Sequence, residues 1–478
     1  MLKNIGDMKI SVKIIFILLI CVSYNSCNSI QKNNVQKEVK PNILFILVDD
    51  LGWSDTSFMG NPVYETPNLD KLATEGVLFK DAYAPAANCA PSRASILSGK
   101  NTPEHGIYTV GSSKRGKSKD RKLIPIENKR VLDDSFLTIA EALKQNGYTS
   151  ASIGKWHLGK DPRTQGFDIN IGGTKAGHPK SYFSPYKNKA LKDGKKGEYL
   201  TDRLTNEAIS FIEKNKEKPF FLYLPYFTVH TPLQGKEELI SKYETKINND
   251  KRFNSKYGAM VESLDKNVGR LLHTLKELNI DKNTLVVFLS DNGGLASISS
   301  QFPLRAGKGS YYEGGIRVPC IIKWPNKIKG NRKTNIPITG MDIFPTLIDA
   351  VNDKKKYDLD GISLLPFLKN NQKIEERALF WHFPIYLEKV NSLKDQARDT
   401  LFRTRPGSVV RKGKWKLHQY FENNEFELYN LENDIQEQTD LSKQYPEKVK
   451  ELLQDLNIFR KDKNAPIPVE INEEFIGE

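Results

Sequence analysis

Carboxylate and amide side chains follow two apolar runs of this 478-residue chain. Asp49 and Asp50 end the first run, and Asp291 and Asn292 end the second. Because the carboxyl ends of parallel strands meet at one edge of a sheet, these four side chains can converge on one point. Oxygen ligands without His or Cys favour Ca²⁺, or Mg²⁺, over Zn²⁺. Either pair alone would more often cap a turn, but together the two pairs predict a metal site.

Cysteine is scarce in this chain. Cys21 and Cys27 fall in the N-terminal segment, which leaves Cys89 and Cys320 in the remainder. Two thiols make no disulfide framework, and the ordinary expectation is one bridge or two buried apolar side chains. The neighbours of Cys89 indicate another role, because it begins the segment CAPSRASILSGK at 89–100.

This segment resembles the C-x-P-S-R signature of the type I sulfatases. In that family a dedicated maturation enzyme oxidises the cysteine to formylglycine (3-oxoalanine), so the resemblance implies that Cys89 becomes the nucleophile and a metal ligand. A hydrated aldehyde has one hydroxyl to attack sulfur and a second that later expels sulfate. Serine has a single hydroxyl and therefore cannot release the sulfate in this way. Arg93 would neutralise and orient this group. The family signature commonly ends in Thr-Gly-Arg, whereas this one ends in Ser98-Gly99-Lys100.

Three further segments match the family pattern in order: GKWHLG at 154–159, VHTP at 229–232 and LRAGKG at 304–309. By this resemblance, Lys155 and Lys308 bind sulfuryl oxygens. The resemblance also implies that His157 hydrogen-bonds the formylglycine and takes its proton when sulfate leaves. His230, with Lys308 beside it, would protonate the leaving alkoxide. Asp291 is a further candidate, as the base that assists attack.

The apolar pattern of the chain predicts the elements that position these residues. Continuous apolar runs predict buried parallel strands at 41–48, 219–224 and 284–289, with a weaker candidate at 149–153. Apolar residues at three-to-four spacing predict helices at 135–145, 201–214 and 257–278. Strand and helix alternate, which indicates an α/β fold with a mainly parallel sheet flanked by helices. The resemblance implies the alkaline-phosphatase-like form of that fold.

We expect four segments along the chain. They are an export signal at 1–27, a linker at 28–40, a sulfatase catalytic domain at 41–370 and a smaller C-terminal α+β subdomain at 371–478. In the last segment, the sequence predicts hairpin strands at 408–417 and 426–430 and a helix near 446–460.

The first residues are typical of an export signal, since lysines precede an apolar run at 14–22 that is too short to span a bilayer comfortably. Cys27 follows this run, as does the lipidation site of a bacterial lipoprotein. Lipidation of Cys27 and simple cleavage both remain open. We therefore expect the protein in the periplasm or at the cell surface, and in the case of lipidation the lipid anchor would be its one membrane contact.

The formal net charge is +14, from 72 Lys and Arg against 58 Asp and Glu. The lysines follow one another along the whole chain, whereas a nucleic-acid-binding protein usually concentrates them, so no nucleic-acid partner is expected. A diffuse positive field suits a polyanionic substrate such as a sulfated glycan. A lysine-rich surface without any partner would have the same composition.

Two segments outside the shared motifs, 172–186 and 381–384, are expected to form rim loops. His178 and His382 in these segments, together with Arg405, are the candidate substrate contacts, with structural locking of the loops as the alternative. These segments resemble the polysaccharide sulfatases of Bacteroidetes-type glycan degraders. That resemblance implies marine algal polysaccharides such as ulvan or carrageenan ahead of host glycosaminoglycans.

Two other functions fit parts of the sequence. Phosphomonoester and phosphonate hydrolases share the fold, but most use Ser or Thr as nucleophile and additional metal-binding histidines. A non-catalytic surface glycan-binding lipoprotein would have lost the metal ligands, which are present here. The sequence therefore favours a sulfuric ester hydrolase that needs a formylglycine-generating partner enzyme.

Overall fold

The structure is a computed structural model that describes residues 40–389 and 396–477. The predicted export signal, its Cys27 and the predicted linker up to residue 39 lie outside the described residues. In the two described ranges, no helix is both long enough and apolar enough to cross a bilayer.

Nine strands of the described residues form the main sheet, in the order β4-β3-β5-β1-β6-β7-β2-β8, with β9 beside β2. They are β1 (Asn42–Val48), β2 (Val77–Tyr83), β3 (Thr149–Ile153), β4 (Ile169–Ile171), β5 (Phe220–Pro225), β6 (Thr284–Ser290), β7 (Arg317–Lys323), β8 (Arg332–Thr334) and β9 (Ile338–Thr339). Only β7 runs antiparallel to its neighbours among these strands. The four predicted strands are confirmed as β3, β5, β1 and β6, the adjacent strands at the centre of the sheet.

Alternate side chains of β1 enter two separate hydrophobic cores. Ile43 and Phe45 belong to the core on one face, while Leu44 and Ile46 belong to the core on the other. Successive side chains of a strand point to opposite faces, so a strand covered on both sides is apolar at every position. This is why the apolar run that predicted β1 is continuous.

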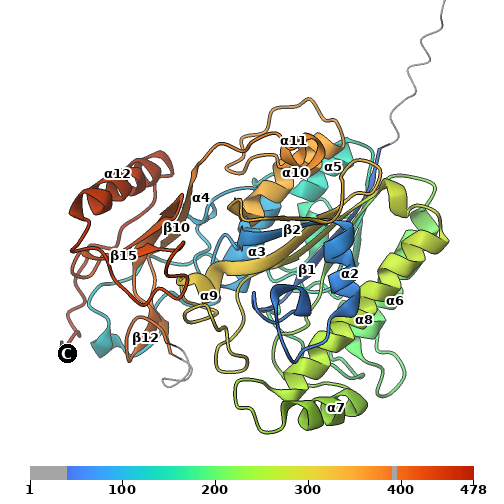
Figure 1. The fold of residues 1–478 in the computed structure, drawn as a ribbon, viewed down its shortest axis with the longest axis horizontal. Helices are drawn as coiled ribbons and strands as arrows, with labels where there is room; N and C mark the ends of the chain where they lie inside the picture. The colour runs from blue at the N-terminus through green and yellow to red at the C-terminus, as the bar shows by residue number, and fades with distance from the viewer. Residues whose placement is uncertain (1–39, 390–395, 478) are drawn as a thin grey trace, which may run out of the picture. The chain divides into compact units, whose positions relative to one another are not determined.

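Helices cover both faces of the sheet (Figure 1). One face is covered by α2 (Pro67–Glu75), α6 (Leu200–Asn215), α7 (Glu237–Ile247) and α8 (Ser255–Glu277). The other face is covered by α3 (Cys89–Ser98), α5 (Ile139–Gln145), α10 (Ile343–Ala350) and α11 (Leu365–Asn370). The short helices α4 (Thr102–His105) and α9 (Glu313–Ile316) complete this region. The mainly parallel α/β fold is confirmed.

The predicted helices at 201–214 and 257–278 are confirmed as α6 and α8, whereas α5 begins later than the predicted 135. Thr138 sets this start with a capping box. Its Oγ1 accepts a hydrogen bond from the Glu141 backbone N at 3.3 Å, and the Glu141 carboxylate accepts one from the Thr138 backbone N at 2.8 Å. Such reciprocal bonds satisfy amides at a helix start.

A second, antiparallel sheet follows in the order β10-β13-β14-β15 and packs against α12. These elements are β10 (Ala378–Phe383), β13 (Gly407–Lys412), β14 (Trp415–Tyr420), β15 (Glu425–Asn430) and α12 (Pro446–Asp462), with β11 (Leu387–Glu388) and β12 (Phe402–Thr404) paired separately. The predicted C-terminal hairpin and helix are confirmed. The prediction of a rim loop at 381–384 is wrong, because Trp381, His382 and Phe383 are buried within β10. The boundary at 370 stays a prediction.

A buried ion-pair network joins this second sheet to α9. Lys416 Nζ on β14 lies 2.9 Å from Glu313 Oε1 and 2.9 Å from Glu437 Oε1, and all three side chains are inaccessible to solvent. Burial raises the pKa of Glu437 to about 7, although Lys416 opposes the rise. Burial acts on Glu313 in the same sense, but Lys416 and Arg317 outweigh it and lower the pKa of Glu313 to about 2.

We expect Glu437 to contribute less to the free energy of unfolding as the pH rises from about 5 to about 8. A glutamate with a folded pKa near 7 and an unfolded pKa near 4.5 stabilises the fold fully below the lower value, and this contribution is lost as pH passes through the upper one. Glu437→Gln should therefore gain stability relative to the unmodified protein as the pH rises across this range, because the amide keeps the shape without the titration. Urea unfolding of both proteins across this pH range measures the difference between their free energies of unfolding. A difference that does not change with pH would exclude this role of Glu437.

Candidate active site

The four predicted metal ligands lie at adjacent strand ends. Asp49 and Asp50 follow β1, Asp291 and Asn292 follow β6, and these two strands pair in parallel. The Asp50 backbone N donates to Asp291 Oδ1 at 3.2 Å, and Asn292 Nδ2 donates to Asp50 Oδ1 at 2.8 Å. All four residues are buried. The structure therefore brings these side chains together.

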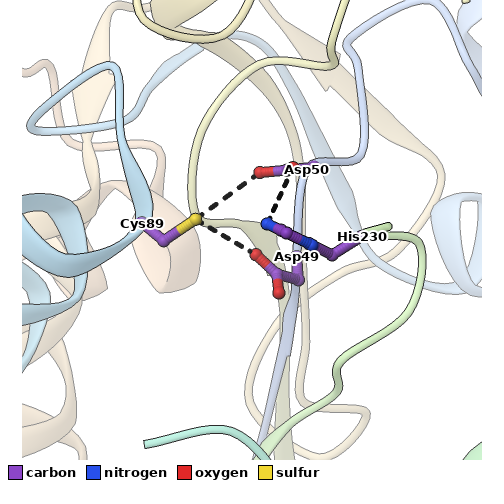
Figure 2. Close-up of side chains that lie close together, drawn as sticks. All are labelled: Asp49, Asp50, Cys89 and His230. Carbon is purple, nitrogen blue, oxygen red and sulfur yellow. Dashed lines mark hydrogen bonds and ion pairs between the residues drawn. The ribbon is translucent and has the colours of Figure 1, made fainter. Parts of the chain in front are cut away.

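Cys89 is the first residue of α3 and points into this acidic group (Figure 2). Its Sγ lies 3.3 Å from Asp49 Oδ1 and 3.6 Å from Asp50 Oδ1, and it accepts a hydrogen bond from Lys308 Nζ at 3.3 Å. Both Cys89 and Cys320 are free thiols in the described part of the chain. The alternative of a bridge between them is excluded, and the two thiols lie in different chemical surroundings.

Three cations balance the three carboxylates. The pairs are Lys155 with Asp49, Arg93 with Asp291 and Lys308 with Asp50, each at 2.7 Å. Buried charges need such partners, since an unpaired charge away from water is costly. Arg93 Nη2 makes no hydrogen bond within residues 40–389 and 396–477, which leaves one buried donor available to a ligand.

Burial and neighbouring charges shift the pKa values of Asp49 and Asp50 in opposite directions. Burial raises the pKa of Asp49 well above its usual range, and Lys155 opposes that rise. Burial would also raise the pKa of Asp50, but the charge of Lys308 lowers it below its usual range. Two adjacent carboxylates thus differ in their affinity for a proton, and a cation bound between them would favour the ionised form of both.

The two active-site histidines come from loops after neighbouring strands. His157 follows β3, and its Nδ1 is buried without a hydrogen-bond partner among the described residues. His230 follows β5, with Nε2 at 3.6 Å from Asp50 Oδ2 and Nδ1 at 2.8 Å from the Thr231 carbonyl oxygen. Since Nδ1–H donates to that carbonyl, Nε2 carries the lone pair of the neutral ring.

Both histidines are held in the neutral form. Burial lowers the pKa of His157 well below its ordinary value, and the positive charges of Lys155 and Arg93 lower it further. Burial also lowers the pKa of His230, although Asp50 opposes the change. Each ring can therefore accept a proton at neutral pH.

The oxygen donors fit a hard divalent cation. Asn292 Oδ1 is buried and has no hydrogen-bond partner in the described part of the chain, which is costly unless a ligand binds it. Together with the carboxylates of Asp49, Asp50 and Asp291 it makes an all-oxygen set of the kind that Ca²⁺ or Mg²⁺ prefers. Ligand atoms of Asp49, Asp50, Cys89 and His230 also lie within 4.8 Å of one another, so His230 belongs to a cluster from which the sequence analysis had left it out.

Of the predicted substrate contacts, His178 lies beside the site. It is exposed, and its ring meets that of His230 edge to face, with 6.1 Å between centroids. Arg405 forms ion pairs with Asp399 at 2.6 Å and with Glu422 at 2.9 Å. Its role at a substrate stays a prediction.

His382 does not fit its predicted role as a substrate contact. It is 1% exposed, with Nδ1 at 2.8 Å from Ser408 Oγ and Nε2 at 2.9 Å from the Pro466 carbonyl oxygen. Burial lowers its pKa to about 3. A neutral ring with both nitrogens hydrogen-bonded by the protein has a structural role. The aromatic residues around His382 predicted a substrate-binding loop because composition alone does not distinguish a buried aromatic segment from an exposed one.

Tyr182 was missed as a positioning residue. Its hydroxyl donates to the Phe227 carbonyl at 2.5 Å and lies 2.8 Å from the His230 carbonyl oxygen, so it ties the loop before α6 to the active-site histidine. The sequence does contain a signal for this role, because Tyr182 is a large aromatic residue in a segment rich in Gly, Pro and Lys. An aromatic ring in such a segment contributes most to stability when it is buried.

A family model for sulfatases matches residues 41–353, which include the acidic group, Cys89, both histidines and all three cations. The chain belongs to the sulfatase family. This sulfatase is accordingly a sulfuric ester hydrolase, as predicted. A second model, described as N-sulphoglucosamine sulphohydrolase, C-terminal, matches residues 307–462 and so extends over the second sheet and α12.

Curated relatives and solved structures agree with this family. The sulfatase is 33% identical over 485 residues to a sulfatase of Formosa agariphila, with 85% of each chain covered. It is 34% identical over 377 residues to N-acetylgalactosamine-6-sulfatase of Mus musculus, with 72% of this chain and 68% of that one covered. The crystal structure of Ps i-CgsB in complex with k-i-k-neocarrahexaose matches with a TM-score of 0.73 at 31% identity, over 91% of this chain and 95% of that one.

A phosphonate monoester hydrolase of Agrobacterium radiobacter has the same fold, with a TM-score of 0.65 over 89% of this chain and 96% of that one. At 21% identity this likeness concerns the fold alone. It agrees with the predicted alkaline-phosphatase-like architecture.

Proposed function

We propose that this sulfatase removes sulfate esters from a sulfated polysaccharide or its oligosaccharides, with a formylglycine made from Cys89 as nucleophile. The observation that carries the proposal is the position of the Cys89 thiol, between two carboxylates and the Lys308 ammonium. The other buried thiol, Cys320, lies in the apolar core, where burial raises its pKa. Of the two thiols in the described residues, only Cys89 has neighbours suited to a reactive group.

Conversion of Cys89 is a two-electron oxidation in which R–CH₂–SH and water give R–CHO and H₂S, while two electrons and two protons pass to an acceptor. It therefore requires a separate maturation oxidoreductase, with O₂ or another two-electron acceptor. The hydrated aldehyde supplies one hydroxyl that attacks sulfur and a second whose collapse to the aldehyde releases sulfate. A divalent cation held by Asp49, Asp50, Asp291 and Asn292 would supply Lewis-acid polarisation of the sulfuryl group.

The protein's own cations surround the position where charge changes during cleavage. Lys155 and Lys308 place ammonium groups against the two carboxylates that flank residue 89, where they can also bind sulfuryl oxygens. Arg93 Nη2 offers a buried donor to the oxygen of residue 89. These charges are fixed by the fold before substrate arrives, so little reorganisation is needed during the reaction.

The two histidines divide the proton transfers. His157 is neutral and can take the proton of the second hydroxyl as sulfate leaves. His230 must be protonated to act as the acid, and its lowered pKa opposes this in the resting site. A bound sulfate ester brings negative charge beside the ring, which favours the protonated form, and Nε2 is the nitrogen that would carry the transferred proton.

The proposed substrate class rests on the relatives and on the chain's net positive charge. Ps i-CgsB was solved with a carrageenan-type hexasaccharide, and we place marine algal polysaccharides such as carrageenan or ulvan first. The mammalian relatives make sulfated N-acetylgalactosamine glycans the second choice. Export to the periplasm or cell surface, with Cys27 lipidated or its segment cleaved, remains part of this proposal.

Mass spectrometry combined with sulfate release tests the proposal. The protein is produced with a maturation enzyme, the peptide over 89–100 is weighed, and sulfate is measured after incubation with carrageenan, ulvan and chondroitin sulfate. We expect an aldehyde at residue 89 and sulfate release from at least one glycan, with 4-nitrophenyl phosphate left intact. An unmodified thiol in an active preparation would sink the formylglycine mechanism. Turnover of 4-nitrophenyl sulfate without release from any glycan would overturn the polysaccharide assignment.

A further inference from the structure

A long loop between β4 and α6, residues 172–199, lines one side of the active site. Gly177 packs against His157 so closely that a Cβ there would lie 2.5 Å from the ring carbon Cε1. His178 meets the His230 ring edge to face, and Tyr182 hydrogen-bonds the His230 carbonyl at 2.8 Å. The loop thus contacts both active-site histidines.

The same loop has a concentrated positive charge. Between residues 175 and 196 it carries seven lysines and one acidic residue, Asp193. All seven lysines are exposed, and no ion pair joins any of them to a carboxylate within the described ranges: Lys175, Lys180, Lys187, Lys189, Lys192, Lys195 and Lys196. Asp193 is itself engaged, since its Oδ1 accepts a hydrogen bond from the Tyr186 backbone N at 2.7 Å.

Several lysines elsewhere on this protein have acidic partners. On α7, Lys242 and Lys246 both pair with Glu65, at 2.6 and 2.7 Å, and Lys236 pairs with Asp202 at 2.7 Å. A surface that serves only solubility mixes both signs in this way. The seven lysines of the loop have no such partner within the described ranges, and the loop that carries them contacts both histidines of the site.

The loop is also packed in a way that holds the lysines in place. Four of the loop's own side chains are buried: Tyr182, Tyr186, Leu191 and Tyr199. The ring of Tyr182 stacks on that of Tyr199 with 5.8 Å between centroids. The Ser184 backbone N donates to the Glu198 carbonyl at 2.9 Å. Positive side chains therefore project from an ordered support, which lowers the entropic cost of binding an extended anion.

We infer that the loop of residues 172–199 is a second substrate-binding surface, which binds sulfate groups of the same glycan beyond the one being cleaved. The inference rests on the proposed function and sharpens it, because the preferred substrate then carries several sulfates along one chain. Exposed ammonium groups bind sulfate as point charges, and salt screens them with a Debye length of about 8 Å at physiological ionic strength. Binding through this surface should therefore weaken strongly with salt.

The test compares two triple variants of the full chain, each lacking three exposed lysines. The loop variant is Lys175→Gln, Lys180→Gln and Lys187→Gln. The control variant is Lys214→Gln, Lys216→Gln and Lys218→Gln, which lie at the far end of α6, about 24 Å along the helix from the loop. Dextran sulfate is the probe, uncharged dextran is the blank, and isothermal titration calorimetry gives Kd over a range of NaCl concentrations.

We expect the loop variant to bind dextran sulfate roughly tenfold more weakly than the unmodified protein, and the control variant to stay within about twofold. The dependence of log Kd on log salt should be shallower in the loop variant alone. Equal affinities in all three proteins, or equal losses in both variants, would overturn the inference. Binding needs neither turnover nor maturation of Cys89, so absence of sulfate release would count against the proposed function without touching this result.

Discussion

Replacing Cys89 with alanine is expected to lower kcat for 4-nitrophenyl sulfate by about a thousandfold or more, because the variant lacks the precursor of the nucleophile. Cys320→Ala is the matched control, since it removes the other described thiol from an apolar core far in sequence from the site. It should lose some stability and keep its kcat. Steady-state kinetics on both variants, with circular dichroism to verify folding, measures the difference.

Cys89→Ser refines this result. In a host that oxidises only cysteine, the serine keeps one hydroxyl but has no aldehyde to regenerate, so at most a single sulfate should be transferred per molecule. A single-turnover experiment would show this as one equivalent of released alcohol without steady turnover. Full activity in Cys89→Ser would contradict the assignment of residue 89.

Removal of divalent cations is expected to abolish turnover and to lower the melting temperature. A cation that binds only the folded state, at a free concentration about a thousand times its Kd, raises the free energy of unfolding by about 4 kcal/mol. After treatment with a chelator, Ca²⁺ and Mg²⁺ are added separately, and differential scanning fluorimetry follows the melting temperature alongside activity. The ion that restores both at the lower concentration is the preferred ligand.

Asp291→Asn should remove this cation-dependent rise in melting temperature, because it replaces one anionic ligand of the buried set. Asp265→Asn is the control, since Asp265 is also a buried carboxylate but hydrogen-bonds Asn68 and the backbone of Leu69 instead. The control should melt lower than the unmodified protein and still respond to the cation. An unchanged response in Asp291→Asn would remove Asp291 from the proposed ligands.

The centre of the sheet could be predicted because its strands are buried on both faces and therefore read as unbroken apolar runs. The strand β7 could not, since Pro319 interrupts its sequence and its antiparallel direction follows from pairing with β6 and β2. The aromatic strand β10 was read as a loop. A short aromatic run fits a rim and a core equally well until its partner strand is known.

The meeting of the four candidate metal ligands was predictable for a geometrical reason, because β1 and β6 are neighbours and both are followed by carboxylates. Lys155 pairs with Asp49 across 106 positions of the sequence. The family resemblance predicted a functional lysine at position 155 but did not predict its carboxylate partner. The lysine-rich loop was overlooked because charge was judged over the whole chain. A count within a window of about twenty residues would have found it.

Under the maturation of Cys89 that we propose, the burial of this thiol imposes an order of events on biosynthesis. Its side chain is 1% exposed at the start of α3, beneath the loops that carry the lysines and histidines of the site. An enzyme that must reach this thiol cannot do so once the sheet and α3 have packed. Oxidation therefore competes with folding, and each molecule that folds first is stranded as an inactive thiol form. The yield of active enzyme in a cell is then governed by the ratio of two rates, maturation and folding, more than by the amount of polypeptide made.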